Sequence, residues 1–131
     1  ERSRGLGDVY KRQELDCLVI DLPPGISDEF LTLINYVKGK HIAITIPTRT
    51  SLDVLMRYIN LLNSVGHKAS ILVINNLLNT KIERISRVID NLHLPYVIMP
   101  YIENVEDALS KGQVPNEAVD VLNNILSSIS K

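Results

Sequence analysis

The chain has 131 residues, enough for one domain, and its 14 basic and 15 acidic side chains leave a net charge of −1. This balance gives no direct indication of nucleic-acid or membrane-surface binding, and a hydrophobic share of 45% excludes a disordered chain. The single cysteine, Cys17, cannot form an internal disulfide, and no apolar run reaches the roughly 20 residues of a membrane span. These features favour a cytoplasmic globular protein without a transmembrane segment.

The first thirteen residues differ in character from the rest. Glu1–Gln13 holds four basic residues and no periodic apolar pattern. From Ser3 the segment SRGLGDVYKRQ resembles the translation of an oligonucleotide adapter used to prepare sequencing libraries. The alternative is a basic arm that binds nucleic acid. We expect residues 1–13 to be an adapter-derived artefact without a defined fold, and the domain to comprise residues 14–131.

From Leu15 onward, short β-rich runs alternate with longer segments of helical period. Strands are predicted at residues 15–22, 41–46, 70–74 and 96–99. Helices are predicted at residues 28–38, 52–65, 81–92, 105–111 and from 116 onward. This alternation is typical of βαβ units with a parallel sheet, so the predicted fold class is α/β.

The same patterns predict burial and helix caps. The first strand is expected to be largely buried, with Cys17 inside it as a small apolar side chain. Asp28 and Asn116 are expected to cap their helices. Apolar residues at helical spacing predict the buried positions, which are Phe30, Leu31, Ile34 and Val37, then Leu52, Leu55, Ile59 and Leu62, then Ile82, Ile85, Ile89 and Leu92, and finally Ala118, Leu122, Ile125 and Ile129.

In open α/β sheets, ligands bind beyond the carboxyl ends of the strands. The first predicted strand delivers Asp21 there, and a rigid Pro23-Pro24-Gly25 turn follows. A carboxylate at this edge can hold Mg²⁺, usually through water, and a glycine lets a backbone N–H approach a terminal phosphate. The pattern favours a nucleotide-phosphate site.

Residues 21–33, DLPPGISDEFLTL, resemble the Mrp-type branch of the MinD/ParA/Mrp-like family of deviant P-loop ATPases. The resemblance continues through AITIP at residues 43–47, LVINN at residues 72–76 and PYVIMPYIENVEDALSKG at residues 95–112. It implies a partial P-loop NTPase fold, a three-layer sandwich with a mostly parallel sheet. The chain would be the carboxy-terminal part, since the family's glycine-rich Walker A loop is absent from this sequence.

The resemblance implies site residues and an activity. Asp21 would be the Walker B aspartate that orders Mg²⁺, and Gly25 would face the γ-phosphate of ATP. Asn75 or Asn76 would bind the adenine edge, although loop or helix capping is the alternative for both. The loop that would lie against the base begins with Pro100 and Tyr101. The parent protein would be a slow, homodimeric Mg²⁺-dependent ATPase, and this chain alone would be inactive.

Many Mrp-type proteins carry Cys-x-x-Cys after the asparagine motif, where two thiolates would bind an iron–sulfur cluster. Here residues 76–84 read NLLNTKIER, without cysteine. An iron–sulfur cluster therefore lacks ligands in this chain, and remains conceivable only through residues upstream or in a partner. The sequence does not choose between iron–sulfur cluster assembly, positioning of cell components and metallocofactor maturation as the physiological output, and it does not indicate protein partners.

Two rival interpretations come from other classes of protein. One is a receiver-like or flavodoxin-like module that hydrolyses no nucleotide, and the other is an interaction domain that has lost its phosphate loop. Three histidines add no site, because each lies beside the start of a predicted strand, at the edge opposite the expected ligand. We expect these histidines to be ordinary polar residues, namely His41, His67 and His93.

Overall fold

A computed structural model describes residues 16–130, and the chain divides into two compact units, Glu1–Tyr36 and Val37–Lys131. The expected artefact at residues 1–13 lies outside the described residues. The predicted α/β class is confirmed, since helices alternate with three parallel strands in one sheet. Within residues 16–130, no helix has the length and apolar character to cross a bilayer.

The predicted first strand is wrong over its described part. Residues 16–22 form no strand, and the apolar side chains of Leu18, Val19 and Ile20 are 57%, 84% and 45% exposed. Cys17 is exposed as well, so its expected burial is also wrong. A strand depends on backbone hydrogen bonds to a neighbour and on a covered face. Residues 16–22 have neither among the described residues, and β propensity alone does not replace them.

The first unit contains helix α2 (Asp28–Tyr36), which buries Phe30 and Ile34 as predicted. Val37, predicted to be buried, lies beyond the helix end and is 37% exposed. The cap is Ser27 rather than Asp28, because the Phe30 backbone N–H donates to Ser27 Oγ at 3.3 Å. Leu31, also predicted to be buried, is only partly covered.

The sheet of the second unit contains β1 (His41–Thr45), β2 (Ala69–Asn75) and β3 (Tyr96–Met99), in the order β1-β2-β3 and all parallel. The three predicted strands at residues 41–46, 70–74 and 96–99 are thus confirmed. Central β2 is buried on both faces, as its continuous apolar run requires. The carboxyl ends of all three strands consequently meet at one edge.

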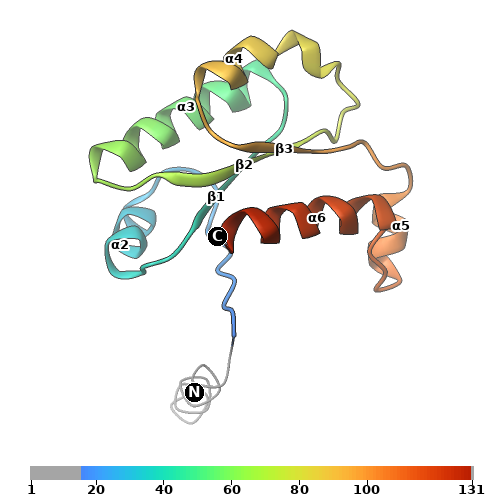
Figure 1. The fold of residues 1–131 in the computed structure, drawn as a ribbon, viewed down its shortest axis with the longest axis horizontal. Coiled ribbons are helices and arrows are strands. Elements are labelled where there is room, and N and C mark those ends of the chain that lie inside the picture. Colours follow the sequence, from blue (N-terminus) through green and yellow to red (C-terminus); the bar gives the residue numbers. More distant parts are fainter. Residues whose placement is uncertain (1–15, 131) are drawn as a thin grey trace. The chain divides into compact units, whose positions relative to one another are not determined.

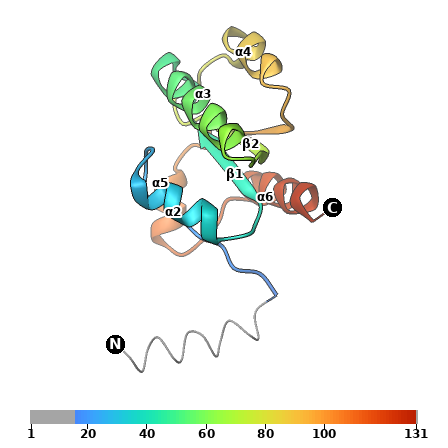
Figure 2. The ribbon, with the colours of Figure 1, turned by 90° about the vertical axis from the view of Figure 1, so that its left-hand side faces the viewer.

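Helix α3 (Arg49–Ser64) lies with α4 (Ser86–Asn91) on one side of the sheet, as Figures 1 and 2 show. Thr48 caps α3, since its Oγ1 accepts from the Ser51 backbone N–H at 3.2 Å. The helix ends before Gly66, whose φ of +81° suits glycine. The four predicted positions are all buried, namely Leu52, Leu55, Ile59 and Leu62.

Helix α6 (Asn116–Ile129) covers the opposite face of the sheet (Figure 1). Its buried Ile125 belongs to a core cluster with Ile71 and Val73 of β2. Leu122, predicted to be buried, is 43% exposed, because Val121 packs against that cluster beside it. Asn116 is the first helical residue and makes no capping bond with its side chain, so its predicted role as cap is wrong.

The predicted helix at residues 81–92 is split into a 3₁₀ turn, η1 (Ile82–Arg84), and α4. Ile85 separates them with φ −115° and ψ −1°, outside ideal helix geometry. Ile85 and Ile89 are buried as predicted, whereas Ile82 and Leu92 are only partly covered. The remaining helix, α5 (Val105–Ser110), follows β3 as expected.

Candidate functional site

The candidate site of the second unit lies at the carboxyl edge of the sheet. Asn75, the last residue of β2, pairs in register with Met99, the last residue of β3. The Asn76 backbone N–H donates to the Met99 carbonyl at 2.9 Å. The pairing therefore brings the two predicted amides next to Pro100 and Tyr101, which follow β3 directly.

The side chain of Asn76 forms hydrogen bonds within its own loop. Its Nδ2 donates to the Thr80 carbonyl at 3.0 Å, and its Oδ1 accepts from the Thr80 backbone N–H at 2.8 Å. Asn76 is only 7% exposed. Asn79 turns the chain between them with φ +52°, a conformation that asparagine tolerates better than most residues. Asn76 thus closes the β2–η1 loop through both ends of its amide.

Asn75 differs from its neighbour. It is partly exposed, and its side chain makes none of the hydrogen bonds found within residues 16–130. Its backbone carbonyl accepts from the Leu77 N–H at 2.9 Å, which fixes the end of β2. Of the two amides, Asn75 is therefore the one that can donate to and accept from an external group.

Pro100 is exposed and Tyr101 is 49% exposed, so the loop after β3 offers a proline and an aromatic ring at this edge. Tyr101 also lines a hollow of about 750 Å³ formed with α5 and the start of α6. Asn104 opens α5 from a left-handed conformation with φ +59°. The hollow is open and polar, consistent with a surface recess.

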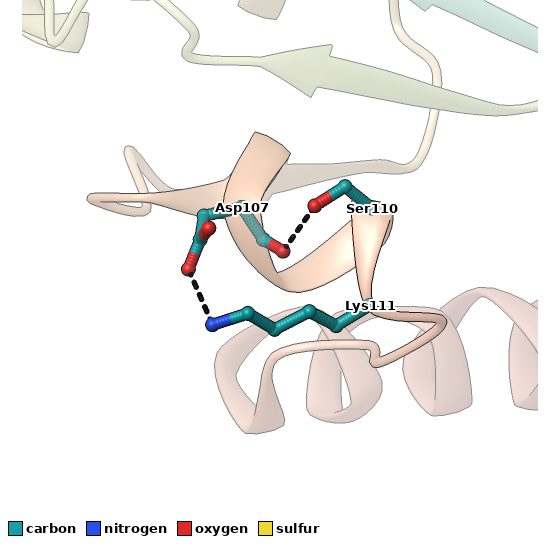
Figure 3. Close-up of polar contacts among 3 residues, drawn as sticks. All are labelled: Asp107, Ser110 and Lys111. Atoms are coloured by element: carbon teal, nitrogen blue, oxygen red, sulfur yellow. Dashed lines mark hydrogen bonds and ion pairs between the residues drawn. The ribbon is translucent and has the colours of Figure 1, made fainter.

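The end of α5 is held by exposed polar contacts, drawn in Figure 3. Lys111 Nζ lies 3.1 Å from Asp107 Oδ2, and Ser110 Oγ donates to the Asp107 carbonyl at 2.7 Å. Both members of the ion pair are about two-thirds exposed, at 63% and 66%. An exposed pair of this kind contributes about 0–1 kcal/mol. The pair therefore adds little to the stability of the fold.

Asp21 and Gly25 belong to the first unit, whereas the other four predicted site residues belong to the second. Both are exposed. Gly25 has φ +88°, and nothing lies within 4 Å of a Cβ built on it. Glycine is therefore required there by backbone conformation, while the space beside it stays open for a ligand to approach.

Among the described residues, one carboxylate suits Mg²⁺, but no set of side chains could bind an iron–sulfur cluster. Mg²⁺ at nucleotide sites takes most of its ligands from water and phosphate, so the single exposed carboxylate of Asp21 suits it. No group of three or more His, Cys, Asp or Glu side chains in residues 16–130 could hold a metal ion. The exposed Cys17 is the only thiol in the chain.

Sequence reasoning missed Ser27 and Thr80. Ser27 caps α2, and hydrogen bonds from the backbone and from Ser27 lower the pKa of the Glu29 carboxyl. The serine before two acids is a usable signal for such a cap. Thr80 has no comparable signal, because only its backbone groups bind Asn76.

Comparison with known proteins identifies the family. The sequence model of the ParA-type NUBPL iron-transfer P-loop NTPase matches residues 6–118, a range that begins inside Glu1–Gln13. An iron–sulfur cluster carrier protein of Saccharolobus solfataricus is 40% identical over 65 residues, which cover 48% of this chain and 22% of that relative. The chain therefore spans well under two thirds of that relative. With its DLPPG motif, its parallel sheet and this match, the chain belongs to the NUBPL iron-transfer P-loop NTPase family.

Proposed function

We propose that this chain supplies the metal-ordering and base-binding parts of an ATP site in a slow, Mg²⁺-dependent ATPase. The observation that carries the proposal is the meeting of Asn75 with the Pro100–Tyr101 loop at the carboxyl edge of the sheet. This edge is where α/β folds bind nucleotides. The family match supports the same class of ligand.

In this proposal Asn75 binds the base. Its amide can donate to one nitrogen edge of adenine and accept from the exocyclic amino group. Asn76 keeps its amide on Thr80 and holds the loop in place. The exposed Tyr101 ring and the rigid Pro100 wall one side of the purine.

The phosphate end depends on Asp21 and Gly25. When bound, Mg²⁺ neutralises charge on the phosphate oxygens. Asp21 would hold the ion, through water, and the backbone N–H of Gly25, which has open space beside it, would be free to donate to the terminal phosphate. The 131 residues contain no glycine-rich loop with lysine, so the chain alone is not expected to bind ATP appreciably.

The output we propose is handling of an iron–sulfur cluster as cargo, in a cytoplasmic homodimer. The family description and the archaeal cluster carrier support this choice over positioning of cell components. One exposed thiol, Cys17, cannot hold a cluster by itself. Cluster ligands therefore come from another segment of a longer protein or from a partner.

Calorimetry with ATP and Mg²⁺ tests the base-binding part. A longer protein, joining this chain to a glycine-rich phosphate-binding segment of the family, should bind ATP, and the 131-residue chain should not. Asn75→Ala in the longer protein should weaken binding about tenfold, or about 1.4 kcal/mol. Asn123→Ala, an exposed amide on α6, is the matched control and should change nothing. Micromolar binding by the short chain, or unchanged affinity after Asn75→Ala, contradicts the proposal.

A further inference from the structure

Two histidines meet at the amino edge of the sheet, far from the carboxyl edge discussed above. His41 is the first residue of β1, and His67 lies between the end of α3 and the start of β2. Their ring centres are 5.4 Å apart, and the ring planes make an angle of 74°. The predicted location of both residues at this edge is confirmed, but the contact between their rings was not predicted.

The backbone holds both rings in place. His41 pairs in register with Ala69, two residues after His67. The turn at Gly66 brings the chain back from α3, and the His67 backbone N–H donates to the Leu62 carbonyl at 2.9 Å. Leu62 is fully buried in the core. The pair is thus anchored on a strand and on a tied turn, and needs little ordering to bind a ligand.

His41 has a polar atom without a partner. Its Nε2 is buried and forms no hydrogen bond among the described residues. Leaving such an atom unpaired costs stability, so a buried ring nitrogen of this kind calls for an explanation. Burial, and then the nearby His67, lower the pKa of the His41 imidazole.

The 5.4 Å between the ring centres fits an edge-to-face aromatic contact, and it also fits two ligands on one ion. An imidazole nitrogen binds Zn²⁺ at about 2.0–2.1 Å, which puts the ring centre about 3.2 Å from the metal. Two such rings at a tetrahedral angle have centres about 5.2 Å apart, close to the 5.4 Å found here.

We infer that His41 and His67 form a two-histidine site for a divalent transition-metal ion such as Zn²⁺, with water completing the coordination shell. Imidazole suits Zn²⁺, Cu²⁺ and Ni²⁺. Lys40 and Lys68 flank the two histidines in sequence and oppose a cation, so the affinity is expected to be micromolar rather than tighter. The site lies at the opposite end of the strands from Asn75 and is independent of the nucleotide proposal.

The test is a ZnCl₂ titration of the 131-residue chain carrying Cys17→Ser, so that the thiol cannot bind the ion. Calorimetry should show one saturable micromolar site per chain. His41→Gln and His67→Gln should each weaken it at least about tenfold. His93→Gln is the control, since His93 lies before β3, and should leave the affinity unchanged.

A second readout avoids reliance on the variants' folding. In histidine side-chain NMR spectra of the Cys17→Ser chain, Zn²⁺ should shift the ring signals of His41 and His67 together and leave those of His93 in place. Absence of saturable binding up to about 1 mM ZnCl₂ would overturn the inference and leave only an aromatic contact. Equal shifts at His93, or binding that survives both single variants, would overturn it as well.

Discussion

Replacing Asn76 with alanine should destabilise the fold, because this amide closes the β2–η1 loop. The side chain is 7% exposed and makes two hydrogen bonds to the Thr80 backbone, at 2.8 and 3.0 Å. Alanine removes both bonds and leaves the Thr80 N–H and carbonyl without their partner. Neighbouring Asn75 provides an internal comparison, since its side chain makes no hydrogen bond within residues 16–130.

The size of the loss follows from those two bonds. Each neutral hydrogen bond contributes about 0.5–1.5 kcal/mol net. Thr80 is partly exposed, so water reaches its freed backbone groups in part and the loss falls near the middle of the range. We expect Asn76→Ala to lower the free energy of unfolding by about 2 kcal/mol, or the thermal midpoint by roughly 8 °C.

Urea unfolding, followed by circular dichroism, gives the free energy of unfolding of the 131-residue chain with Asn76→Ala and with Asn75→Ala. Asn75→Ala should cost less than about 0.5 kcal/mol, as for a substitution that breaks no named interaction. The assignment of Asn76 to the loop and Asn75 to a ligand fails if the two losses are equal, or if Asn76→Ala costs less than about 0.5 kcal/mol.

Three further outcomes are expected. Burial and the nearby His67 lower the pKa of His41, so the unfolded chain binds the proton more readily than the folded chain. The free energy of unfolding should therefore fall as the pH drops below about 6.5. In urea titrations at several pH values, His41→Gln should flatten this dependence. Deletion of residues 1–13, the segment that resembles an adapter, should leave the thermal midpoint unchanged within error, and a loss of several degrees would refute that interpretation. After anaerobic reconstitution, the longer protein with Cys17→Ala should show the same cluster absorbance as the unchanged protein, whereas loss of that absorbance would make this thiol a ligand.

Local patterns predicted the second unit well. In α3 the apolar spacing identified every buried position from Leu52 to Leu62, because a helix packed on one face repeats its contacts every three or four residues. The three parallel strands were also found from their apolar runs and bounding turns. The family resemblance implied Asn75 and Pro100 as site residues, and the strand pairing of the structure places them at one edge of the sheet.

Features that depend on a partner could not be predicted in this way. Residues 16–22 have the composition of a strand, but strand formation requires a neighbouring backbone that composition does not specify. The choice of Ser27 over Asp28 as the cap turns on one hydrogen bond, and both residue types cap well. The separate roles of Asn75 and Asn76 depend on how the loop curls back through Thr80.

The most direct test of the proposed ATPase is Asp21→Asn in a longer protein that joins this chain to the glycine-rich segment. The substitution keeps the shape of the side chain and removes the charge that orders Mg²⁺. We predict that ATP turnover falls about tenfold or more, at least about 1.4 kcal/mol of barrier, while unfolding changes by less than about 1 kcal/mol because Asp21 is exposed. The control is Asp28→Asn, another exposed acid in the same unit, which should leave turnover nearly unchanged. Intact turnover after Asp21→Asn, or loss of turnover with Asp28→Asn alone, would contradict the account.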